Sequence, residues 1–465
     1  MKKILIALMV ALFATGAHAT IARLTALGMD ELDSEGSYYI KDSRNIFLNV
    51  ASINDYADTV MYEWGGNGAS TLNAGLATVT TMNSRSNIDA DAAPKARGGF
   101  LLKNGDAVYG VFLGNDSQVS SMLRILSSSV AAVDGRAGNN KSAYTLATAD
   151  ESIDVFYGSK TGDMKWGVNL AYTGSKNEVS KATSSENYDQ KAMAVRLGVI
   201  TDQWDAHLTM GLMGESSSTT RAADIGAAYT GADFEHKFDG SLGYHIGGSY
   251  KVSETGRAFA YYKGIKWDAI DGADYTKYST ATCTGSNLSS VAKVNCSSGK
   301  NGKSEGEFGS IVLGYGYQKN YGKTDLFGKI YFQNDKIEQK ANQTAKVNQA
   351  KIPLTVGFEH TATEWLTLRG SVTQVVYGTR KNDKYEELNA FAQLLAVSVY
   401  GADTGGKKVS MPNTTDVRAG ASLNFGDLVF DGYIGMRSNT GAKATEDGTL
   451  RSDSLLTRVG MTYKF

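Results

Sequence analysis

The chain has 465 residues, of which 42% are hydrophobic, and its 47 Lys and Arg nearly balance its 48 Asp and Glu. This balance excludes the basic surface that is typical of proteins that bind nucleic acid. Three Pro residues against 52 Gly and 25 Tyr favour long, uninterrupted β-strands with one apolar and one polar face.

The N-terminus has the pattern of a secretory signal peptide. Two lysines precede an apolar run over residues 4–14, and Ala17-His18-Ala19 supplies a small-x-small cleavage site. We therefore expect residues 1–19 to be removed and the protein to be exported. No later apolar run approaches the roughly 18 residues that a transmembrane helix needs.

Residues 20–56 lack the strand-like alternation that follows them. The stretch Asp42-Ser43-Arg44-Asn45-Ile46-Phe47-Leu48-Asn49 and the adjoining residues 50–54 resemble the N-terminal segments of some porin-like and fatty-acid-channel barrels. In those barrels the segment lies in the periplasm or plugs the lumen. The resemblance therefore implies one of these two roles for residues 20–56.

From residue 57 onward, apolar and polar residues alternate with period two. In the first strand of this region, Tyr62 and Trp64 oppose Met61 and Glu63. The tripeptide Asn104-Gly105-Asp106 marks a tight hairpin between the next two strands. Each strand of this kind has one face suited to lipid and one suited to water.

The alternation predicts about sixteen strands over residues 57–465, or fourteen or eighteen if one hairpin is miscounted. Short and long connections alternate, which is typical of outer-membrane barrels with short periplasmic turns and long outer loops. An even number of strands places both ends of the chain on the periplasmic side. We expect an all-β, transmembrane, antiparallel up-and-down β-barrel; a large exported sandwich or solenoid would show regular repeats or two apolar faces.

Two further patterns favour a membrane barrel. The five tryptophans fall at predicted strand ends, where aromatic girdles mark the lipid–water boundary. A Lys or Arg at the lipid-facing midplane would cost about 2–4 kcal/mol, and the assignable strands keep these residues on the polar face. The tryptophans are Trp64, Trp166, Trp204, Trp267 and Trp365.

The last strand carries Val459, Met461, Tyr463 and Phe465 on one face, with Arg458 and other polar residues on the opposite face. It resembles the closing strand of Gram-negative outer-membrane β-barrels, which ends in an aromatic residue. In that family the strand is read by the barrel assembly machinery. The resemblance implies an outer-membrane location and assigns the assembly signal to these four residues.

Sixteen strands with polar inner faces resemble the general porins, which implies passive diffusion of ions and small hydrophilic solutes. The partners implied are outer-membrane lipid and the assembly machinery, with the chain either a monomer or a homotrimer. We expect no cofactor. The predicted pore-lining residues are Lys165, Arg196, Lys329, Lys351, Glu359, Arg369, Arg418, Asp431, Arg437 and Arg458.

Cations outnumber carboxylates among these inward residues, which predicts a mild anion preference unless loop carboxylates neutralise them. Porins narrow the pore with a long loop after the fifth strand, but that connection is short here. The segment 116–150 is the candidate substitute, with Arg124 at the narrowing, or it covers the outer mouth instead. Two other functions stay open: a structural or adhesive barrel without a pore, and a substrate-specific channel plugged by residues 20–56.

Cysteine and histidine chemistry adds little to this interpretation. Cys283 and Cys296 lie in a polar stretch, and in an oxidising compartment they are expected to form a local disulfide. We expect no metal site. His207 and His245, with Asp205 near, could form a proton-transfer cluster, but they are better explained as ordinary lumen residues, and we expect no enzymatic activity.

Overall fold

The computed structural model describes residues 20–29, 35–65, 95–115, 151–181, 184–221, 233–240, 243–273, 303–340, 344–383, 408–410, 414–439 and 458–465. The predicted signal peptide, the segment around Arg124, and both Cys283 and Cys296 lie outside these residues. Predictions made for them stay predictions.

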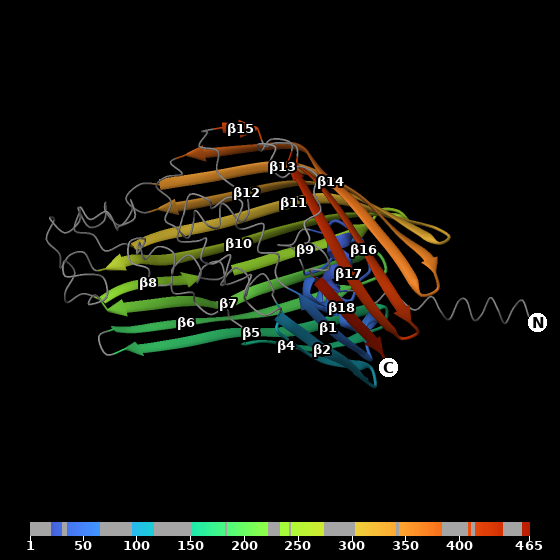
Figure 1. The fold of residues 1–465 in the computed structure, drawn as a ribbon, viewed down its shortest axis with the longest axis horizontal. Coiled ribbons are helices and arrows are strands. Elements are labelled where there is room, and N and C mark those ends of the chain that lie inside the picture. Colours follow the sequence, from blue (N-terminus) through green and yellow to red (C-terminus); the bar gives the residue numbers. More distant parts are fainter. Residues whose placement is uncertain are drawn as a thin grey trace, which may run out of the picture.

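The chain forms one closed antiparallel barrel (Figure 1). Its strands are β1 (Thr59–Gly65), β2 (Lys95–Asn104), β3 (Ala107–Leu113), β4 (Glu151–Thr161), β5 (Met164–Lys181), β6 (Ser184–Ile200), β7 (Trp204–Arg221), β8 (Asp233–Gly240), β9 (Gly243–Lys251), β10 (Gly256–Ala273), β11 (Lys303–Tyr321), β12 (Thr324–Lys340), β13 (Thr344–Thr363), β14 (Leu366–Asp383), β15 (Lys408–Ser410), β16 (Thr414–Phe425), β17 (Leu428–Asn439) and β18 (Arg458–Lys464).

Sixteen strand positions surround the barrel, as predicted from the sequence. Of the 18 strands, β8 and β9 share one position, because both pair with β7 and with β10. The three-residue strand β15 is an addition on β14, which also pairs with β16. The ring closes where β1 pairs with β18, so the backbone ladder has no gap there.

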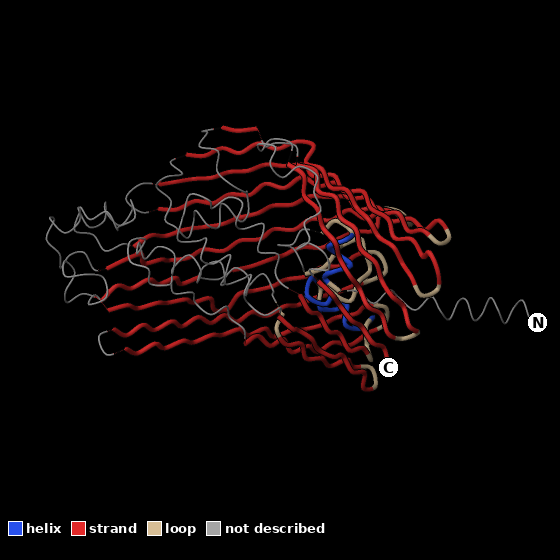
Figure 2. Tube along the Cα trace, in the orientation of Figure 1, coloured by secondary structure: helices blue, strands red, loops and turns tan. Residues whose placement is uncertain are grey.

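Tight turns gather at one end of the barrel. Gly105, Gly162, Gly322 and Gly426 each adopt a positive φ at a two-residue turn, a conformation that glycine reaches without steric cost. The tan turns and the C-terminus lie together at this end (Figure 2). The described strands differ in length: β13 has 20 residues and the described part of β18 has 7.

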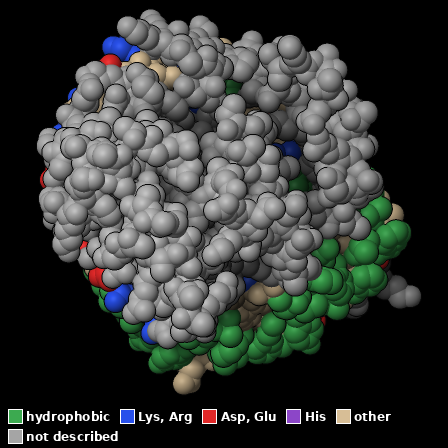
Figure 3. All heavy atoms as spheres, turned by 60° about the vertical axis from the view of Figure 1, so that its left-hand side comes forward, with side chains coloured by type: hydrophobic (Ala, Val, Ile, Leu, Met, Phe, Trp, Pro, Cys, Tyr) green, Lys and Arg blue, Asp and Glu red, His purple; other side chains and the backbone are tan. Residues whose placement is uncertain are grey.

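The outer face divides into an apolar band and an ionic zone. Along β12 the outward residues Leu326, Ile330 and Phe332 are exposed, and they span about 20 Å at about 3.3 Å per residue. Farther along the same face, Lys336 Nζ lies 2.9 Å from Glu307 Oε1. Hydrophobic side chains gather on the outside of the wall (green in Figure 3). An outward apolar run followed by charged residues on the same strand face is the pattern that transmembrane barrels show where the wall leaves the lipid.

Among the described residues, no helix is both long enough and apolar enough to cross a membrane. The described helices are short and belong to the N-terminal segment: α2 (Ile21–Ala26), α3 (Asn45–Leu48) and the 3₁₀ helix η2 (Val50–Asp55).

The tryptophans only partly follow the expected girdle. Trp64 and Trp204 are exposed on the outer wall, and Trp365 is exposed in the turn between β13 and β14. Trp267, however, lies inside β10, faces the lumen and is 2% exposed. Its ring lies where a Cβ on Gly306 of β11 would be, 2.2 Å from the nearest ring atoms. The prediction is wrong for Trp267 because the glycine on the neighbouring strand makes room for an inward indole.

An arginine on the apolar band should destabilise the barrel, and one in the ionic zone should not. Ile330→Arg is expected to cost about 2–4 kcal/mol of unfolding free energy, and Asn334→Arg, two outward positions along the same strand, about 0–1 kcal/mol. Urea unfolding from lipid vesicles measures both. Equal losses for the two variants would contradict the position of the band.

Candidate functional site

The described N-terminal residues lie inside the barrel, near the end that carries the short turns (blue in Figure 1; blue helices joined by tan loops in Figure 2). Residues 20–29 and 35–56 are called the plug below. Helix α2 packs against β14, β16, β17 and β18, and η2 packs against β3, β4, β5 and β6. The plug therefore contacts opposite sides of the lumen.

Apolar contacts hold the second half of the plug, residues 45–56, against the wall. The Phe47 ring meets the rings of Phe112 and Phe156 edge-on, at centroid distances of 5.1 and 5.6 Å. Asn49 caps η2 by accepting a hydrogen bond from the Ala51 amide, 3.2 Å away. Its own amide donates to two carbonyl oxygens of the wall. These residues belong to the stretch that resembles the N-terminal segments of other barrels.

Inward-facing glycines let the plug approach the wall closely. A Cβ on Gly198 would lie 2.1 Å from Asn49 Oδ1, and one on Gly316 would lie 2.5 Å from the Tyr39 Cβ. Such contacts are impossible for a larger residue unless something moves. The glycines under the plug are Gly158, Gly167, Gly198, Gly247, Gly316, Gly420 and Gly460, on seven different strands.

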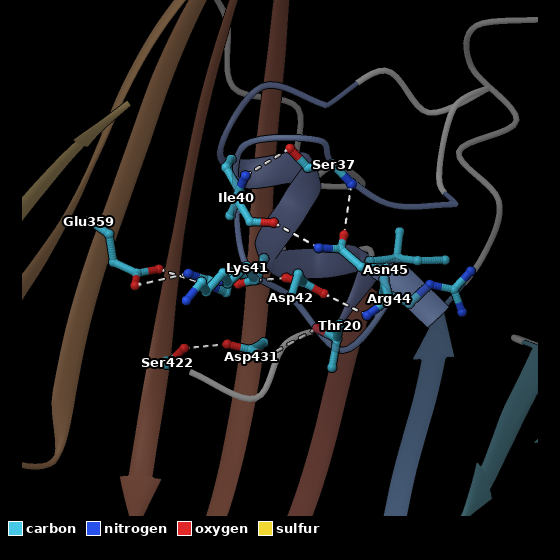
Figure 4. Close-up of polar contacts among 12 residues, drawn as sticks. Thr20, Ser37, Ile40, Lys41, Asp42, Arg44, Asn45, Glu359, Ser422 and Asp431 are labelled. Carbon is cyan, nitrogen blue, oxygen red and sulfur yellow. Dashed lines mark hydrogen bonds and ion pairs between the residues drawn. The ribbon is translucent and has the colours of Figure 1, made fainter. Parts of the chain in front are cut away.

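A buried ionic cluster joins α2 to the β13–β17 side of the wall (Figure 4). The Arg23 guanidinium donates from Nε to Glu359 Oε2 over 2.8 Å and lies 3.0 Å from Asp42 Oδ2. Arg369 Nε donates to the same Glu359 oxygen over 2.5 Å, and its Nη1 donates to Asp431 Oδ1 over 2.8 Å. The plug cation thus joins a wall network that already contains a cation.

A second cluster centres on Glu63 of β1. Its Oε2 lies 3.1 Å from Arg97 Nε on the neighbouring strand and 3.5 Å from Arg44 Nη1 of the plug. Its Oε1 accepts a hydrogen bond from the Ile21 amide, 2.8 Å away. Arg44 also donates to Asn115 Oδ1 over 2.9 Å.

The third cluster lies on the β4–β9 side. Arg196 Nη1 lies 2.7 Å from Asp154 Oδ1, and Arg196 Nη2 lies 3.9 Å from Glu35 Oε1 of the plug. The other Glu35 oxygen lies 3.7 Å from His245 Nδ1. Burial alone would raise the pKa of Glu35, but the adjacent His245 and Arg196 side chains outweigh it and lower that pKa to about 2. Glu35 is therefore charged at neutral pH.

The structure brings several predicted pore-lining residues into these clusters: Arg196, Glu359, Arg369 and Asp431. Lys165 and Arg418 contact the plug elsewhere. Lys165 Nζ lies 2.5 Å from Asp55 Oδ1, and Arg418 Nη1 donates to the Thr25 and Met29 carbonyl oxygens.

The other predicted pore-lining residues lie apart. Lys329 and Lys351 are half-buried on the inner faces of β12 and β13, and Lys329 Nζ lies 4.8 Å from the centroid of the Tyr331 ring. Arg437 and Arg458 belong to β17 and β18, but their side chains lie outside those that the structure describes. On β18, Tyr463 is exposed on the outer wall and Thr462 is buried on the inner face, as the alternation predicts.

The predicted arrangement around the histidines is only partly observed. The His207 and His245 rings are neighbours, with centroids 4.7 Å apart. Asp205, however, lies 2.5 Å from Arg257 Nη1 and hydrogen-bonds Ser249. Within the described part of the chain, no three His, Cys, Asp or Glu side chains are grouped so that they could hold a metal ion.

Sequence reasoning missed the site residues of the plug. Arg23, Glu35, Tyr38, Asp42 and Arg44 supply its polar contacts. Of these, only Asp42 and Arg44 belong to the stretch named from the sequence, and no contact was predicted for either. The glycines on the polar face of the predicted strands were the available signal, because wall positions without a side chain leave room for another segment. The described lumen differs from the open one that the general-porin resemblance implied, because the plug occupies it.

Enlarging one of these glycines should displace the plug. Gly316→Leu is expected to push Tyr39 off the wall, whereas Gly328→Leu on the outer face of β12 should change nothing, because an added Cβ there meets no atom closer than 3.9 Å. The reporter is a cysteine at Ala22, which is 2% exposed, in a chain with Cys283→Ser and Cys296→Ser.

We expect maleimide to label the reporter at least about tenfold faster in the Gly316→Leu variant than in the Gly328→Leu variant. Equal labelling rates in the two folded proteins would show that Gly316 does not seat the plug.

Neither a protein-family model nor a curated protein matches the chain. Solved structures match over most of its length at low identity. A FadL homologue from Pseudomonas aeruginosa is 12% identical with a TM-score of 0.39, covering 93% of this chain and 96% of that one.

The Pseudomonas putida toluene transporter TodX is 10% identical with a TM-score of 0.32, covering 94% of this chain and 97% of that one. The FrpB iron transporter of Neisseria meningitidis is 9% identical with a TM-score of 0.35, covering 86% and 63%. At these TM-scores the likeness carries no argument about function.

Proposed function

We propose that the protein is an outer-membrane channel that the plug closes and that conducts small hydrophilic solutes when part of the plug leaves the lumen. The wall beneath the plug carries buried arginines and carboxylates, which would be hydrated in an open lumen. The apolar band on the outer face supports the membrane location. The proposal corresponds to a gated channel rather than a permanently open diffusion pore.

The observation that carries this proposal is that the wall charges are paired with one another as well as with the plug. When one partner of a buried ion pair is removed, the charge left behind costs about 3–5 kcal/mol. Departure of the plug would leave no such charge in the three clusters. The wall pairs are Glu63–Arg97, Asp154–Arg196, Glu359–Arg369 and Arg369–Asp431.

The plug also keeps a pair of its own. Arg23 and Asp42, 3.0 Å apart, both belong to it, and the Asp42 carboxylate accepts a hydrogen bond from the Arg44 amide over 2.8 Å. A plug released into water would retain these contacts. The polar interface therefore specifies one docked position without making departure prohibitive.

The two halves of the plug are attached differently. The apolar clusters of the first half contain seven plug residues and two wall residues: Leu24, Leu27, Met29, Tyr39 and Ile40 with Phe327, and Ala22 and Ala26 with Tyr433. The cluster of the second half contains four plug and five wall residues: Ile46, Phe47, Val50 and Ile53 with Met61, Leu101, Val108, Phe112 and Phe156. We infer that residues 20–29 and 35–44 move while residues 45–56 stay anchored.

Pairing also bears on ion selectivity. Arg196 and Arg369 each have a carboxylate partner in the wall, and Arg418 Nη2 lies 3.6 Å from Asp416 Oδ2. Paired cations contribute little to an anion preference. We therefore propose that the open channel discriminates only weakly between small anions and cations. The neutralising carboxylates belong to the strands of the wall, whereas the alternative considered from the sequence placed them in the loops.

A reversible lock on the plug tests this function. Ala26→Cys with Gly420→Cys, in a chain with Cys283→Ser and Cys296→Ser, places two thiols across the interface. The Ala26 Cβ lies 2.7 Å from a Cβ built at Gly420, and a small shift would reach the roughly 3.5–4.5 Å that a disulfide needs. The added Gly316→Leu change unseats the plug.

Single-channel recording in planar bilayers should show current steps for Gly316→Leu protein with the lock reduced and at least about tenfold fewer steps when it is oxidised. The two single-cysteine variants should not respond to oxidant. Folded, reduced Gly316→Leu protein without any steps would favour the rival function, a structural or adhesive barrel with a permanently filled lumen.

A further inference from the structure

One plug side chain fits a notch in the wall that is made by the wall alone. His207 on β7, Gly247 on β9 and Tyr261 on β10 lie side by side, because His207 is in register with Gly247 and Gly247 with Tyr261. The middle position has no side chain. The two flanking rings therefore border a gap about one residue wide.

Tyr38 of the plug occupies this gap. Its hydroxyl lies 2.6 Å from His207 Nε2, and a Cβ built at Gly247 would be 2.5 Å from the same hydroxyl oxygen. The ring stacks on Phe259 with centroids 5.1 Å apart and planes 10° apart. It also stacks on Tyr261, at 6.1 Å and 19°.

The second histidine braces the notch. The His245 ring meets His207 edge-on at 4.7 Å and Tyr261 edge-on at 5.2 Å. With Tyr38 in place, both histidines and Phe259 are more than 90% buried. The side chains of His207, Phe259 and Tyr261 thus surround a flat space, and His207 Nε2 offers a hydrogen bond at its edge.

We propose that this notch is a binding site for a phenolic ring, that Tyr38 occupies it in the closed state, and that a phenolic solute releases the plug by displacing Tyr38. The faces of Phe259 and Tyr261 select a flat aromatic ring, because stacking needs a π-face on both partners. His207 Nε2 selects a hydroxyl, since a ring without one would leave a buried nitrogen unsatisfied.

The release step rests on the proposed function. A free phenol and the Tyr38 side chain compete for the same notch. Tyr38 is tethered to the notch through the plug, so its effective concentration is of the order of millimolar. A free phenol must exceed that concentration to displace it. Tyr38 belongs to the half of the plug that we infer to move, so losing its contact loosens that half.

Binding is tested with p-cresol, which is the tyrosine side chain as a free molecule. The proteins are the full-length chain with Tyr38→Ala, which empties the notch, and with Tyr38→Ala plus Gly247→Val, which fills it. Circular dichroism first shows that both are folded in the same detergent. Saturation-transfer NMR then compares the p-cresol signal of the two samples, so that partition into micelles cancels.

We expect p-cresol to bind the Tyr38→Ala protein at least about tenfold more tightly than it binds the filled-notch variant or the unaltered protein. Toluene, which lacks the hydroxyl, should bind at least about tenfold more weakly than p-cresol. Equal p-cresol signals from the emptied and filled notches would overturn the site, and equal binding of toluene would overturn the role of His207.

A second measurement separates the notch from the channel. p-Cresol at about 10 mM, which exceeds the millimolar effective concentration of the tethered Tyr38, should raise the open fraction of the unaltered protein in a planar bilayer at least about tenfold, and toluene should not. If p-cresol binds the emptied notch but never opens the channel, the release step is wrong and the site stands. If reduced Gly316→Leu protein conducts but the emptied notch does not bind p-cresol, the channel stands and the site is wrong.

Discussion

Closure of the strand ring is the constraint on which the rest of the structure depends. In lipid, an unpaired backbone amide or carbonyl costs several kcal/mol, so a sheet that crosses a membrane can have no open edge. The pairing of β1 with β18 removes that edge. The Phe465 amide extends this pairing by one hydrogen bond, which it donates to the Asp58 carbonyl over 3.1 Å. Once the ring is closed, period-two alternation sends every second residue inward.

The polar side chains on the inner surface then need hydrogen-bond and ion-pair partners where little water is present. At the short-turn end the plug supplies such partners, and its interface combines two kinds of contact. Buried ion pairs such as Arg23–Glu359 add little net stability, because desolvation offsets the attraction between the charges, yet they fix one docked position. The apolar contacts of Phe47 are less specific, and they anchor the segment to the wall.

Glycine residues of the wall serve both the closed ring of strands and the plug that fills it. A wall residue such as Gly198 or Gly247 weakens its own strand slightly, because it has no side chain to pack against its neighbours. In return it lets a plug atom lie where a Cβ would be. The Tyr38 notch is the most developed example, since a glycine between two aromatic positions makes a space shaped for a ring.

The sequence by itself determined the barrel, because alternation and hairpin turns such as Asn104-Gly105-Asp106 are local patterns that act the same way in every strand. It also determined which face Arg196, Glu359 and Arg369 occupy. Only the tertiary structure decided that these residues meet Glu35 and Arg23 of the plug, and that Trp267 turns inward over Gly306. The contact between Arg23 and Glu359 joins residues 336 positions apart, so it depends on how the ring closes and on what fills the lumen. Ring closure and filling of the lumen leave no periodic signal in the chain.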